Sequence, residues 1–445
     1  MEIVNYEQTG LEAVASWIEN HRDYTIDEKT GKDILRTANI SFVAEGISRA
    51  QSTLLCELKD SYIQQSQRYV TLDCEGFIMP ELSDDDAIQG KRLLDRCFQL
   101  YSEMSRLHEG EFKGRPKQEH YLHGIPIEDA RYILPLATKT NICMTMSGDK
   151  LYNLFELLND QTYAPIFVNF RQKLVEYLPE SILQILPGAA DGQLRRHMVQ
   201  QFYQSYFDQI TPDQTTVLLG AFADLDQRVG LGALTSTQQK TSSQLLAEWG
   251  AAATQKAEQV TQRVLGYGHD SIAEQARTTF GFICSLVTYH QQIRHRLPEI
   301  CREDLQVLLS DQERPICMPE TIRQSDFYTE FLALANDMKQ FRHFVFEKYG
   351  QAAALSFLLN ADQLKVIIGT NARIDIKMLA DRTCMNAQWE IRQLALCKLK
   401  ALKGMSKALY STAAPSCVID RCREGKMSCG KQREVRAMFE EETYG

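Results

Sequence analysis

Two segments of the chain resemble each other, and this internal repeat is the feature that most constrains the fold. The first segment runs from Ser41 to Val70 and the second from Thr278 to Gln306. Each keeps polar residues that the other has lost. The first ends in QSQRY at 65–69, whereas the second carries RHR at 294–296, where the first has CEL at 56–58. We therefore expect a duplicated protein whose surviving site is shared between its halves.

The same complementary loss recurs further along both halves. The first half has ARYILP at 130–135, whereas the second half has ALSFLL at 354–359, with Leu355 where the first half has Arg131. The second half instead keeps NAR at 371–373, Arg382 and AQWEIR at 387–392. It also has GHDS at 268–271 followed by Glu274, an element with no clear counterpart in the first half.

In their order and spacing, these elements resemble the motifs of the flavin-dependent thymidylate synthases. The signature of that family is Arg-His-Arg followed, after a spacer, by Ser-x-Arg. Neither half contains it whole, since the second half has Asp304 and Gln306 where the first has Ser66 and Arg68. The resemblance spans most of both halves. It implies an α+β fold in two tandem copies, with helices packed on a β-sheet in each, so that one chain forms a pseudo-dimer.

The length of the chain agrees with a duplication. Its 445 residues exceed what one hydrophobic core usually organises, so two domains are expected. The turn-rich stretch FDQITPD at 207–213 favours a stop and restart of helical structure. We place the boundary near residue 215, which gives a first repeat of residues 1–215 and a second of residues 216–445.

Composition narrows the class of ligand and the compartment. Hydrophobic residues make up 44% of the chain, yet it has no apolar run of the length that spans a membrane, and its first residues do not resemble a secretion signal. The 12 cysteines are then expected to be reduced thiols in the cytoplasm. A formal net charge of -9 argues against a nucleic-acid polymer as ligand. A small anion bound by a few arginines remains compatible.

Hydrophobic periodicity predicts the elements around these motifs. Residues 278–284 alternate as a strand with one buried face, and residues 285–296 shift to helical spacing before a loop that begins at Leu297-Pro298. A helix is expected from Asn386, as its N-cap, to Gly404. Helical patterns also cover 91–108 and 244–265.

The arginines are the candidate ligand-binding residues because guanidinium groups donate paired hydrogen bonds to phosphate and to polar ring edges. Consecutive backbone amides in the turn at 66–68 could clasp a phosphate. Read alone, the Arg-His-Arg cluster could be a solvated basic edge, and the 66–68 stretch a polar turn. The resemblance implies nucleotide contacts from Gln291, Arg294, Ser66, Gln67, Arg68, Arg131 and Arg382, with Arg294 and Arg382 as catalytic electrophilic stabilisers. It implies flavin contacts from His269, Ser271, Glu274, His295, Arg296, Leu297, Asn371, Arg373 and Lys377.

Lys377 departs from the family pattern, which usually has asparagine there, as the first repeat does at Asn153. The implied reaction is the reductive methylation of dUMP to dTMP, in which methylenetetrahydrofolate supplies the carbon and NADPH reduces FAD. A homodimer would imitate the tetramer of the family. We expect one FAD and one nucleotide per chain. The alternatives are a flavoenzyme acting at C5 of another pyrimidine nucleotide and a non-catalytic nucleotide- or flavin-binding paralogue.

The C-terminal segment holds three cysteines, Cys417, Cys422 and Cys429, within PSCVIDRCREGKMSCGK. Their spacing differs from the paired Cys-x-x-Cys of zinc ribbons. We expect free thiols and no metal. The alternative is a metal ion held by these three with a fourth ligand from elsewhere.

Overall fold

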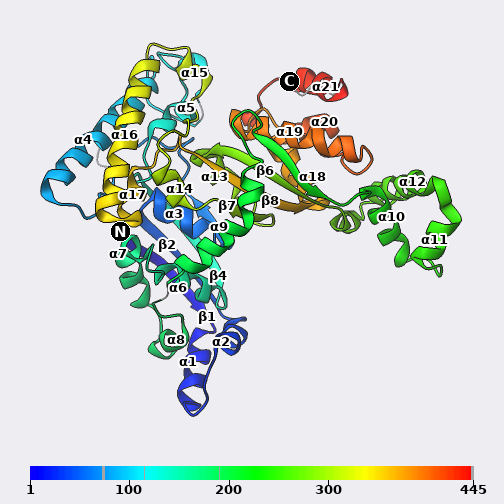
Figure 1. Cartoon of the computed structure of the whole chain (residues 1–445), viewed down its shortest axis with the longest axis horizontal. Helices are drawn as coiled ribbons and strands as arrows, with labels where there is room; N and C mark the ends of the chain where they lie inside the picture. Colours follow the sequence, from blue (N-terminus) through cyan, green and yellow to red (C-terminus); the bar gives the residue numbers. More distant parts are fainter. Residues whose placement is uncertain (73–75, 115, 190, 442–445) are drawn as a thin grey trace. The chain divides into compact units, whose positions relative to one another are not determined.

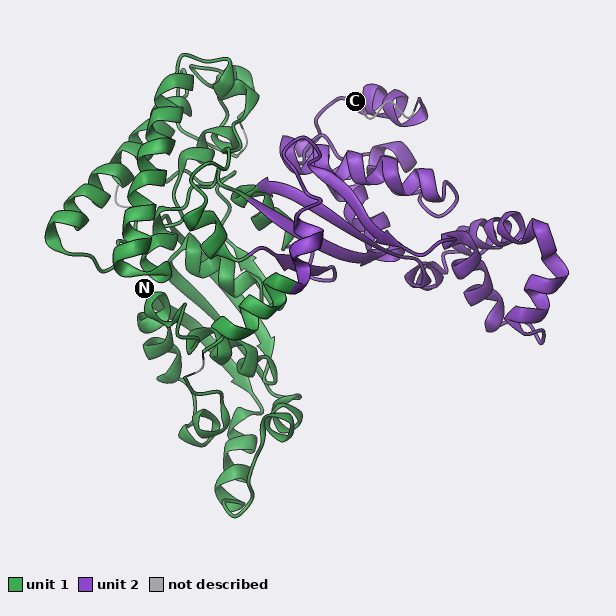
Figure 2. Ribbon diagram, in the orientation of Figure 1, with its two compact units in different colours: residues 1–201, 285–293, 304–363 green, residues 202–284, 294–303, 364–445 purple. Residues whose placement is uncertain are grey.

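The computed structural model describes residues 1–72, 76–114, 116–189 and 191–441. The chain folds into two compact units, coloured separately in Figure 2. Unit 1 comprises residues 1–201, 285–293 and 304–363, and unit 2 comprises residues 202–284, 294–303 and 364–445. The units are therefore not the two halves of the sequence, because parts of the second half belong to unit 1. The boundary between sequence repeats near residue 215 stays a prediction.

Unit 1 contains a four-stranded sheet with the order β1-β2-β4-β3 (Figure 1). Its strands are antiparallel, and β2 pairs with β4 in the register Phe42↔Met144. Side chains alternate across β2, with Ile40, Phe42 and Ala44 fully buried, as expected of a strand with one face on a core. The strands are β1 Glu2–Thr9, β2 Asn39–Ser48, β3 Ser61–Gln64 and β4 Lys139–Ser147.

The helices of unit 1 come from both sequence halves. From the first half they are α1 Leu11–Asn20, α2 Glu28–Leu35, α3 Arg49–Cys56, α4 Asp84–Met104, η1 Gln118–His120, α5 Ile127–Ala130, η2 Arg131–Ile133, α6 Lys150–Leu158, α7 Ala164–Val175 and α8 Glu180–Ile185. From the second half they are α13 Leu286–Gln292, α14 Leu305–Ser310, α15 Glu320–Arg323, α16 Tyr328–Tyr349, α17 Gln351–Ala354 and η5 Leu355–Phe357. Helix α9, Gln193–Phe207, begins in unit 1 and ends in unit 2.

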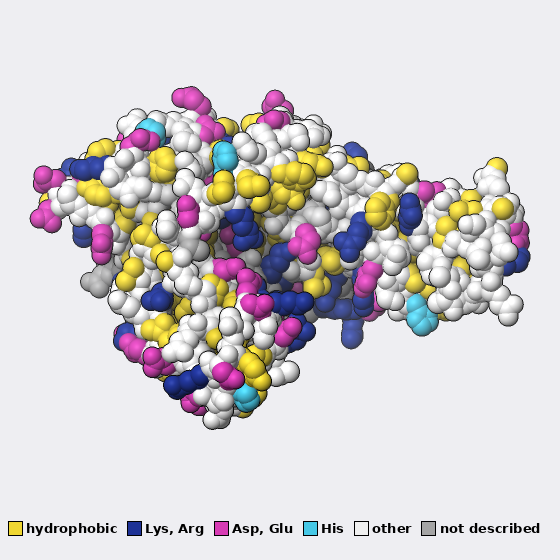
Figure 3. All heavy atoms as spheres, turned by 60° about the horizontal axis from the view of Figure 1, so that its bottom comes forward, with side chains coloured by type: hydrophobic (Ala, Val, Ile, Leu, Met, Phe, Trp, Pro, Cys, Tyr) yellow, Lys and Arg dark blue, Asp and Glu magenta, His cyan; other side chains and the backbone are white. Residues whose placement is uncertain are grey.

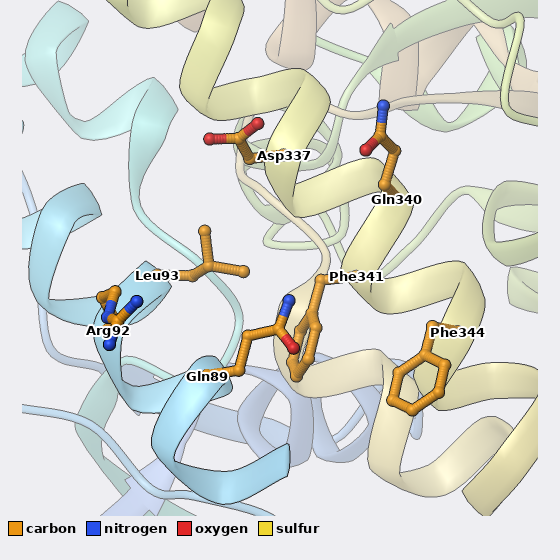
Figure 4. Close-up of a pocket in the computed structure, with 7 residues that line it drawn as sticks. All are labelled: Gln89, Arg92, Leu93, Asp337, Gln340, Phe341 and Phe344. Atoms are coloured by element: carbon orange, nitrogen blue, oxygen red, sulfur yellow. The ribbon is translucent and has the colours of Figure 1, made fainter. Parts of the chain in front are cut away.

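Helices α4 and α16 pack closely because a glycine lies between them. A Cβ added at Gly90 would lie 3.1 Å from ring carbons of Phe341 and Phe357. Beside this contact is a groove of about 390 Å³, which Figure 4 shows between Gln89, Arg92 and Leu93 of α4 and residues of α16. None of the predicted site residues lines it, so the groove belongs to the packing of unit 1.

Equivalent segments of the two repeats pair with each other inside unit 1. Leu136 N donates to Leu358 O at 2.7 Å, and Asn360 N donates to Leu134 O at 2.9 Å. The segment at 130–136 and its counterpart at 354–360 thus exchange reciprocal hydrogen bonds, as expected of a local two-fold relation. The chain therefore carries within unit 1 a contact of the kind that two subunits of a dimer make.

Unit 2 contains a second four-stranded sheet, with the order β5-β6-β8-β7. When the strands of each sheet are numbered along the chain, both sheets have the same spatial order: first, second, fourth, third. The strands are β5 Thr216–Ala221, β6 Arg277–Ser285, β7 Glu299–Arg302 and β8 Gln363–Asn371. The repeated topology confirms the predicted α+β fold in two copies, and β6 confirms the predicted strand at 278–284.

The helices of unit 2 differ from prediction at two places. The pattern at 244–265 predicted one helix, but the chain breaks at Gly250, whose φ of 50° lies in the left-handed region. The helix at 386–404 begins later than predicted, because Gln388 and not Asn386 accepts the N–H groups of Glu390 and Ile391. The elements are α10 Leu225–Thr235, α11 Ser242–Trp249, η3 Gly250–Ala252, α12 Ala253–Gly266, η4 Asp270–Gln275, α18 Ala372–Arg382, α19 Trp389–Met405, α20 Ser416–Ile419, η6 Gly425–Met427 and α21 Gln432–Glu440.

Figure 3 shows one face of the molecule, on which acidic side chains lie among the basic ones. Among the described residues, no helix combines the length and the apolar character needed to cross a membrane.

Candidate active site

The Arg-His-Arg motif lies in a turn between a helix and a strand. Helix α13 ends at Gln292, which is earlier than the predicted end at Arg296, and β7 begins at Glu299. Arg294 and Arg296 are exposed, and His295 between them is partly buried. The motif therefore presents two cations around one shielded imidazole.

A hollow of about 890 Å³ in unit 2 contains this motif. It is formed by residues of η4, by the turn at 294–298, and by Asn371 and residues along α18. Eight predicted site residues line it: Glu274, Arg294, His295, Arg296, Leu297, Asn371, Arg373 and Lys377. Three other predicted residues of unit 2, all of them described, do not line it: His269, Ser271 and Arg382.

His295 is held by Arg382 from the last turn of α18. Arg382 Nε donates to His295 Nε2 at 2.6 Å, so the ring is neutral at Nε2 and carries its proton on Nδ1. Burial lowers the pKa of His295 to about 3, and the charges of Arg382 and Lys377 add to this effect. The imidazole therefore stays uncharged at neutral pH, with a fixed orientation.

Arg373 at the start of α18 is paired with two carboxylates of η4. Its guanidinium lies 2.6 Å from Glu274 and 3.2 Å from Asp270. Asn371 caps the same helix by accepting the N–H of Ile374 at 3.0 Å. These contacts join η4 to α18, so two predicted flavin residues, Glu274 and Arg373, also fix one wall of the hollow.

The lining of the hollow combines charged groups with an apolar surface. Arg294, Arg296 and Lys377 contribute cations, Asp270, Glu274 and Asp381 contribute carboxylates, and Leu297, which is 72% exposed, supplies an apolar surface. Pro298, Ile374 and Met378 extend the apolar part. Charged side chains thus stand beside aliphatic ones in one hollow.

Ser66, Gln67 and Arg68, which are called the clasp below, belong to a separate cluster of polar residues in unit 1. Ser66 Oγ accepts the N–H of Arg68 at 3.1 Å, which closes the turn. Arg68 Nε donates to Glu128 at 2.7 Å, and both side chains are mostly buried. Arg131, only 3% exposed, donates through Nε to the carbonyl of Glu128 at 3.1 Å. The two predicted phosphate-binding arginines thus meet at Glu128.

The buried Gln67 completes this cluster through a residue of the second repeat. Asn360 Nδ2 donates to Gln67 Oε1 at 3.2 Å and to the carbonyl of Arg131 at 2.9 Å. Gln67 Nε2 has no hydrogen-bond partner among the residues that the structure describes. Sequence reasoning missed Glu128 and Asn360. The signal for Glu128 is its position three residues before Arg131, whereas Asn360 comes from the other repeat.

Gln291 also belongs to unit 1 and lies on α13, which packs against α3. It is buried, and its Nε2 donates to Val287 O at 3.3 Å. Nearby, Arg49 Nε donates to His290 Nδ1 at 3.2 Å, and Tyr289 donates to Glu57 at 2.8 Å. Glu57 stands in the first repeat where the second repeat has the central histidine of the motif. Its side chain therefore makes a contact between the two repeats.

The segment of the second repeat that corresponds to the clasp forms the same turn, but its side chains differ. Asp304 Oδ1 accepts the N–H of Gln306 at 2.9 Å, as Ser66 does for Arg68. Asp304 also lies 4.0 Å from Arg196, which pairs with Asp160. The counterpart of Arg131 is the fully buried Leu355. A carboxylate and an aliphatic side chain thus stand where the first repeat has a hydroxyl and an arginine.

Two sheets of identical strand order, the second beside a hollow lined by arginines and carboxylates, define a duplicated α+β protein. The family model described as thymidylate synthase complementing protein matches residues 9–165 and 218–405, one region in each repeat. The chain therefore belongs to the flavin-dependent thymidylate synthase family, which is a family of methyltransferases.

Individual relatives match about the length of one repeat. The chain is 32% identical to the flavin-dependent thymidylate synthase of Geobacter sulfurreducens over 186 residues, which cover 40% of this chain and 79% of that protein. It is 30% identical to the enzyme of the same name from Clostridium tetani over 205 residues, or 42% and 82% of the two chains. The corresponding values for Pyrococcus furiosus are 30% over 181 residues, or 38% and 73%.

Proposed function

We propose that this protein is an FAD-dependent thymidylate synthase with one active site per chain, built from both repeats. It converts dUMP to dTMP, with methylenetetrahydrofolate as carbon donor and NADPH as reductant. The observation on which the proposal rests is that each repeat has lost the motif that the other retains. The second repeat retains Arg294-His295-Arg296 in a hollow suited to a flavin, and the first retains Ser66 and Arg68 in a closed turn.

The hollow of unit 2 is the proposed flavin site. Bound FAD supplies the redox chemistry of the reaction. Arg296 would donate hydrogen bonds to its polar edge or phosphates, Leu297 would cover its apolar face, and Arg294 would face the nucleotide. The neutral imidazole of His295, oriented by Arg382, avoids placing a third cation between the two arginines.

The cluster of unit 1 is the proposed phosphate site for dUMP. Arg68 and Arg131 would bind the phosphate together with the backbone amides of the turn at 66–68. In the structure Glu128 holds Arg68 in place through the 2.7 Å contact. A phosphate dianion offers Arg68 a more highly charged partner than the single carboxylate of Glu128.

The equivalent cluster of the second repeat is proposed to have lost nucleotide binding. Asp304 places a negative charge where the phosphate would lie, and Gln306 provides no positive charge there. Leu355 removes the second arginine. We therefore infer one FAD and one nucleotide per chain. We also propose a cytoplasmic homodimer, since two duplicated chains would supply the four copies of the family's tetramer.

A single-turnover experiment tests the function. The purified protein is reconstituted with FAD, reduced with NADPH under anaerobic conditions, and mixed with dUMP and methylenetetrahydrofolate. The expected result is reoxidation of the flavin with one equivalent of dTMP, and none with UMP or dCMP. Failure of the loaded protein to form dTMP would overturn the proposal, and turnover of UMP or dCMP instead would reassign the substrate.

A further inference from the structure

Asn360 of the second repeat lies against the clasp of the first repeat and is fully buried there. Its backbone N–H donates to Leu134 O at 2.9 Å, a bond that belongs to the pairing of the two repeats within unit 1. Its side-chain Nδ2 donates to the carbonyl of Arg131 at 2.9 Å and to Gln67 Oε1 at 3.2 Å. One side chain thus contacts both the clasp and the segment that carries the second arginine of the cluster.

These contacts fix the orientation of the Gln67 amide. A backbone carbonyl can only accept, so the Asn360 atom that faces Arg131 O must be the donor Nδ2. The Gln67 atom that faces the same Nδ2 must then be the acceptor Oε1. Gln67 Nε2 is therefore turned away from Asn360, and its N–H groups are not used in this network.

Gln67 Nε2 is a buried donor that lacks an acceptor. The residue is 5% exposed, and within residues 1–72, 76–114, 116–189 and 191–441 nothing accepts a hydrogen bond from Nε2. An unpaired buried N–H costs free energy, which an acceptor on a ligand would recover. Because Gln67 lies between Ser66 and Arg68, we assign that acceptor to the ligand of the clasp.

The equivalent position in the first repeat carries an apolar residue. The bonds from Asn360 N to Leu134 O and from Leu136 N to Leu358 O are reciprocal, so the local two-fold relation maps Asn360 onto Leu136. Leu136 is buried, and its side chain can neither donate nor accept. The clasp of the first repeat is thus accompanied by an amide from the second repeat. The altered segment of the second repeat has only an aliphatic side chain of the first repeat at the corresponding position.

We propose that Gln67 Nε2 is a further hydrogen-bond donor to the phosphate of the nucleotide, and that Asn360 is the positioning residue that orients it. This inference rests on the proposed function of the clasp as the phosphate site for dUMP. A phosphate monoester has several acceptor oxygens, so it can accept from Gln67 in addition to Arg68 and the backbone of the turn. The phosphate site would then itself contain residues of both repeats.

Titration with dUMP and with deoxyuridine, which lacks the phosphate, tests the proposal. Gln67→Met removes the donor at similar side-chain length, and Asn360→Leu removes both hydrogen bonds of the positioning amide. Each variant should bind dUMP about tenfold more weakly than the wild type, because a hydrogen bond to a charged group is lost. Each should bind deoxyuridine as the wild type does. Gln67→Glu keeps the acceptor for Asn360 and replaces the donor by a carboxylate oxygen, so it gives the same test if Gln67→Met does not fold.

Asn159→Leu is the matched control for Asn360→Leu. Asn159 also belongs to unit 1, and its Nδ2 donates to the carbonyl of Pro187 at 2.7 Å. The same substitution therefore removes the same kind of hydrogen bond from other segments of the unit. Urea unfolding of all variants shows that they are folded, and the affinity of Asn159→Leu for dUMP should equal that of the wild type.

The double variant Gln67→Met with Asn360→Leu separates positioning from a general structural role. If Asn360 acts through Gln67, the double variant should bind dUMP as weakly as Gln67→Met alone, and not about 100-fold more weakly than the wild type. Wild-type affinity for dUMP in Gln67→Met, an equal loss of affinity for deoxyuridine, or additive losses in the double variant would each overturn the inference and leave the proposed function standing. A wild type that binds dUMP no more tightly than deoxyuridine would overturn the phosphate site itself.

Discussion

Arg382 Nε lies 2.6 Å from His295 Nε2, so the last turn of α18 determines the orientation of the central residue of the Arg-His-Arg motif and which of its ring nitrogens accepts. The guanidinium is permanently charged and can only donate. The imidazole must therefore accept at Nε2, which requires the neutral ring. An arginine predicted to bind nucleotide thus also orients this histidine and adds to the effect of burial, which is the main reason that the ring stays uncharged.

The first prediction concerns how the free energy of unfolding depends on pH below 6.5. The pKa of His295 is lowered from 6.5 to about 3 in the folded protein, chiefly by burial. Between these values the unfolded chain binds a proton that the folded protein does not, so the free energy of unfolding should fall as pH falls from 6.5. The expected slope is about 1.4 kcal/mol per pH unit. Above pH 6.5 this contribution to the pH dependence disappears.

Replacing His295 by glutamine should remove that contribution while keeping an acceptor for Arg382. Urea unfolding of wild type and His295→Gln at pH 6.5, 5.5 and 4.5 measures it, the chosen values lying within the window set by the two pKa values. The difference in free energy of unfolding between the two proteins should change steadily in favour of the variant as pH falls. A difference independent of pH would show that His295 titrates alike in both states.

The second prediction concerns a buried ion pair beneath α18. Lys398 Nζ lies 2.7 Å from Asp375 Oδ1, and both side chains are at most 1% exposed. In Lys398→Met, Asp375 keeps a hydrogen bond from Thr370 at 2.8 Å but loses its cation. The free energy of unfolding should fall by about 3–5 kcal/mol, because a buried charge is left uncompensated.

An exposed pair of the same unit is the control for this prediction. Lys240 pairs with Glu248 with both side chains about half exposed. Lys240→Met should change the free energy of unfolding by about 0–1 kcal/mol, since solvent screens the pair. Equal losses in the two variants, measured by urea unfolding, would contradict a special role for burial.

Much of the fold could be predicted because its signals are local. The alternation at 278–284 predicted β6, and the four-residue spacing of Arg373 and Lys377 placed both on α18. The break at Gly250 was missed because glycine is tolerated inside a helix, so its presence alone does not show that the chain adopts a positive φ there. Asn386 was wrongly predicted as a cap because its side chain binds the distant tail instead.

The partners of the site residues could not be predicted for the same physical reason. Glu128 compensates Arg68 over a distance of many residues, and Asn360 reaches Gln67 from the other repeat. Such contacts depend on how the repeats pair, which no local pattern encodes. The sequence did reveal which residues were retained and lost, and this was enough to predict the family and the complementary repeats.

The third prediction is a stoichiometry. Isothermal titration of the FAD-loaded protein with dUMP should give one nucleotide per chain, because Asp304 and Gln306 replace the hydroxyl and the cation of the clasp. Two nucleotides per chain would show that the second cluster still binds. The double variant Asp304→Ser and Gln306→Arg restores the Ser-x-Arg pattern and tests whether Leu355 alone is enough to prevent binding; we expect it to be enough.

The fourth prediction separates a binding role of Arg68 from a structural one. Arg68 is paired with Glu128, so each partner can be removed alone. Arg68→Gln removes the cation and should weaken dUMP binding about 10- to 100-fold, the loss of one charge-assisted hydrogen bond of about 1.5–3 kcal/mol. Glu128→Gln leaves the cation and removes the carboxylate that competes with phosphate. Its affinity for dUMP should be equal to that of the wild type or a few-fold higher.

Titration of both variants with dUMP gives opposite results for the two roles. If Arg68 only stabilises its turn, Glu128→Gln, which replaces the charged partner of the same 2.7 Å contact by a neutral amide, should also weaken binding. If Arg68 binds phosphate, only Arg68→Gln weakens it. Charge reversal at Arg294 extends the test to the other repeat, and Arg294→Glu should abolish nucleotide binding as Arg68→Glu does. Unchanged affinity in Arg294→Glu would separate the Arg-His-Arg motif from the nucleotide and contradict a shared site.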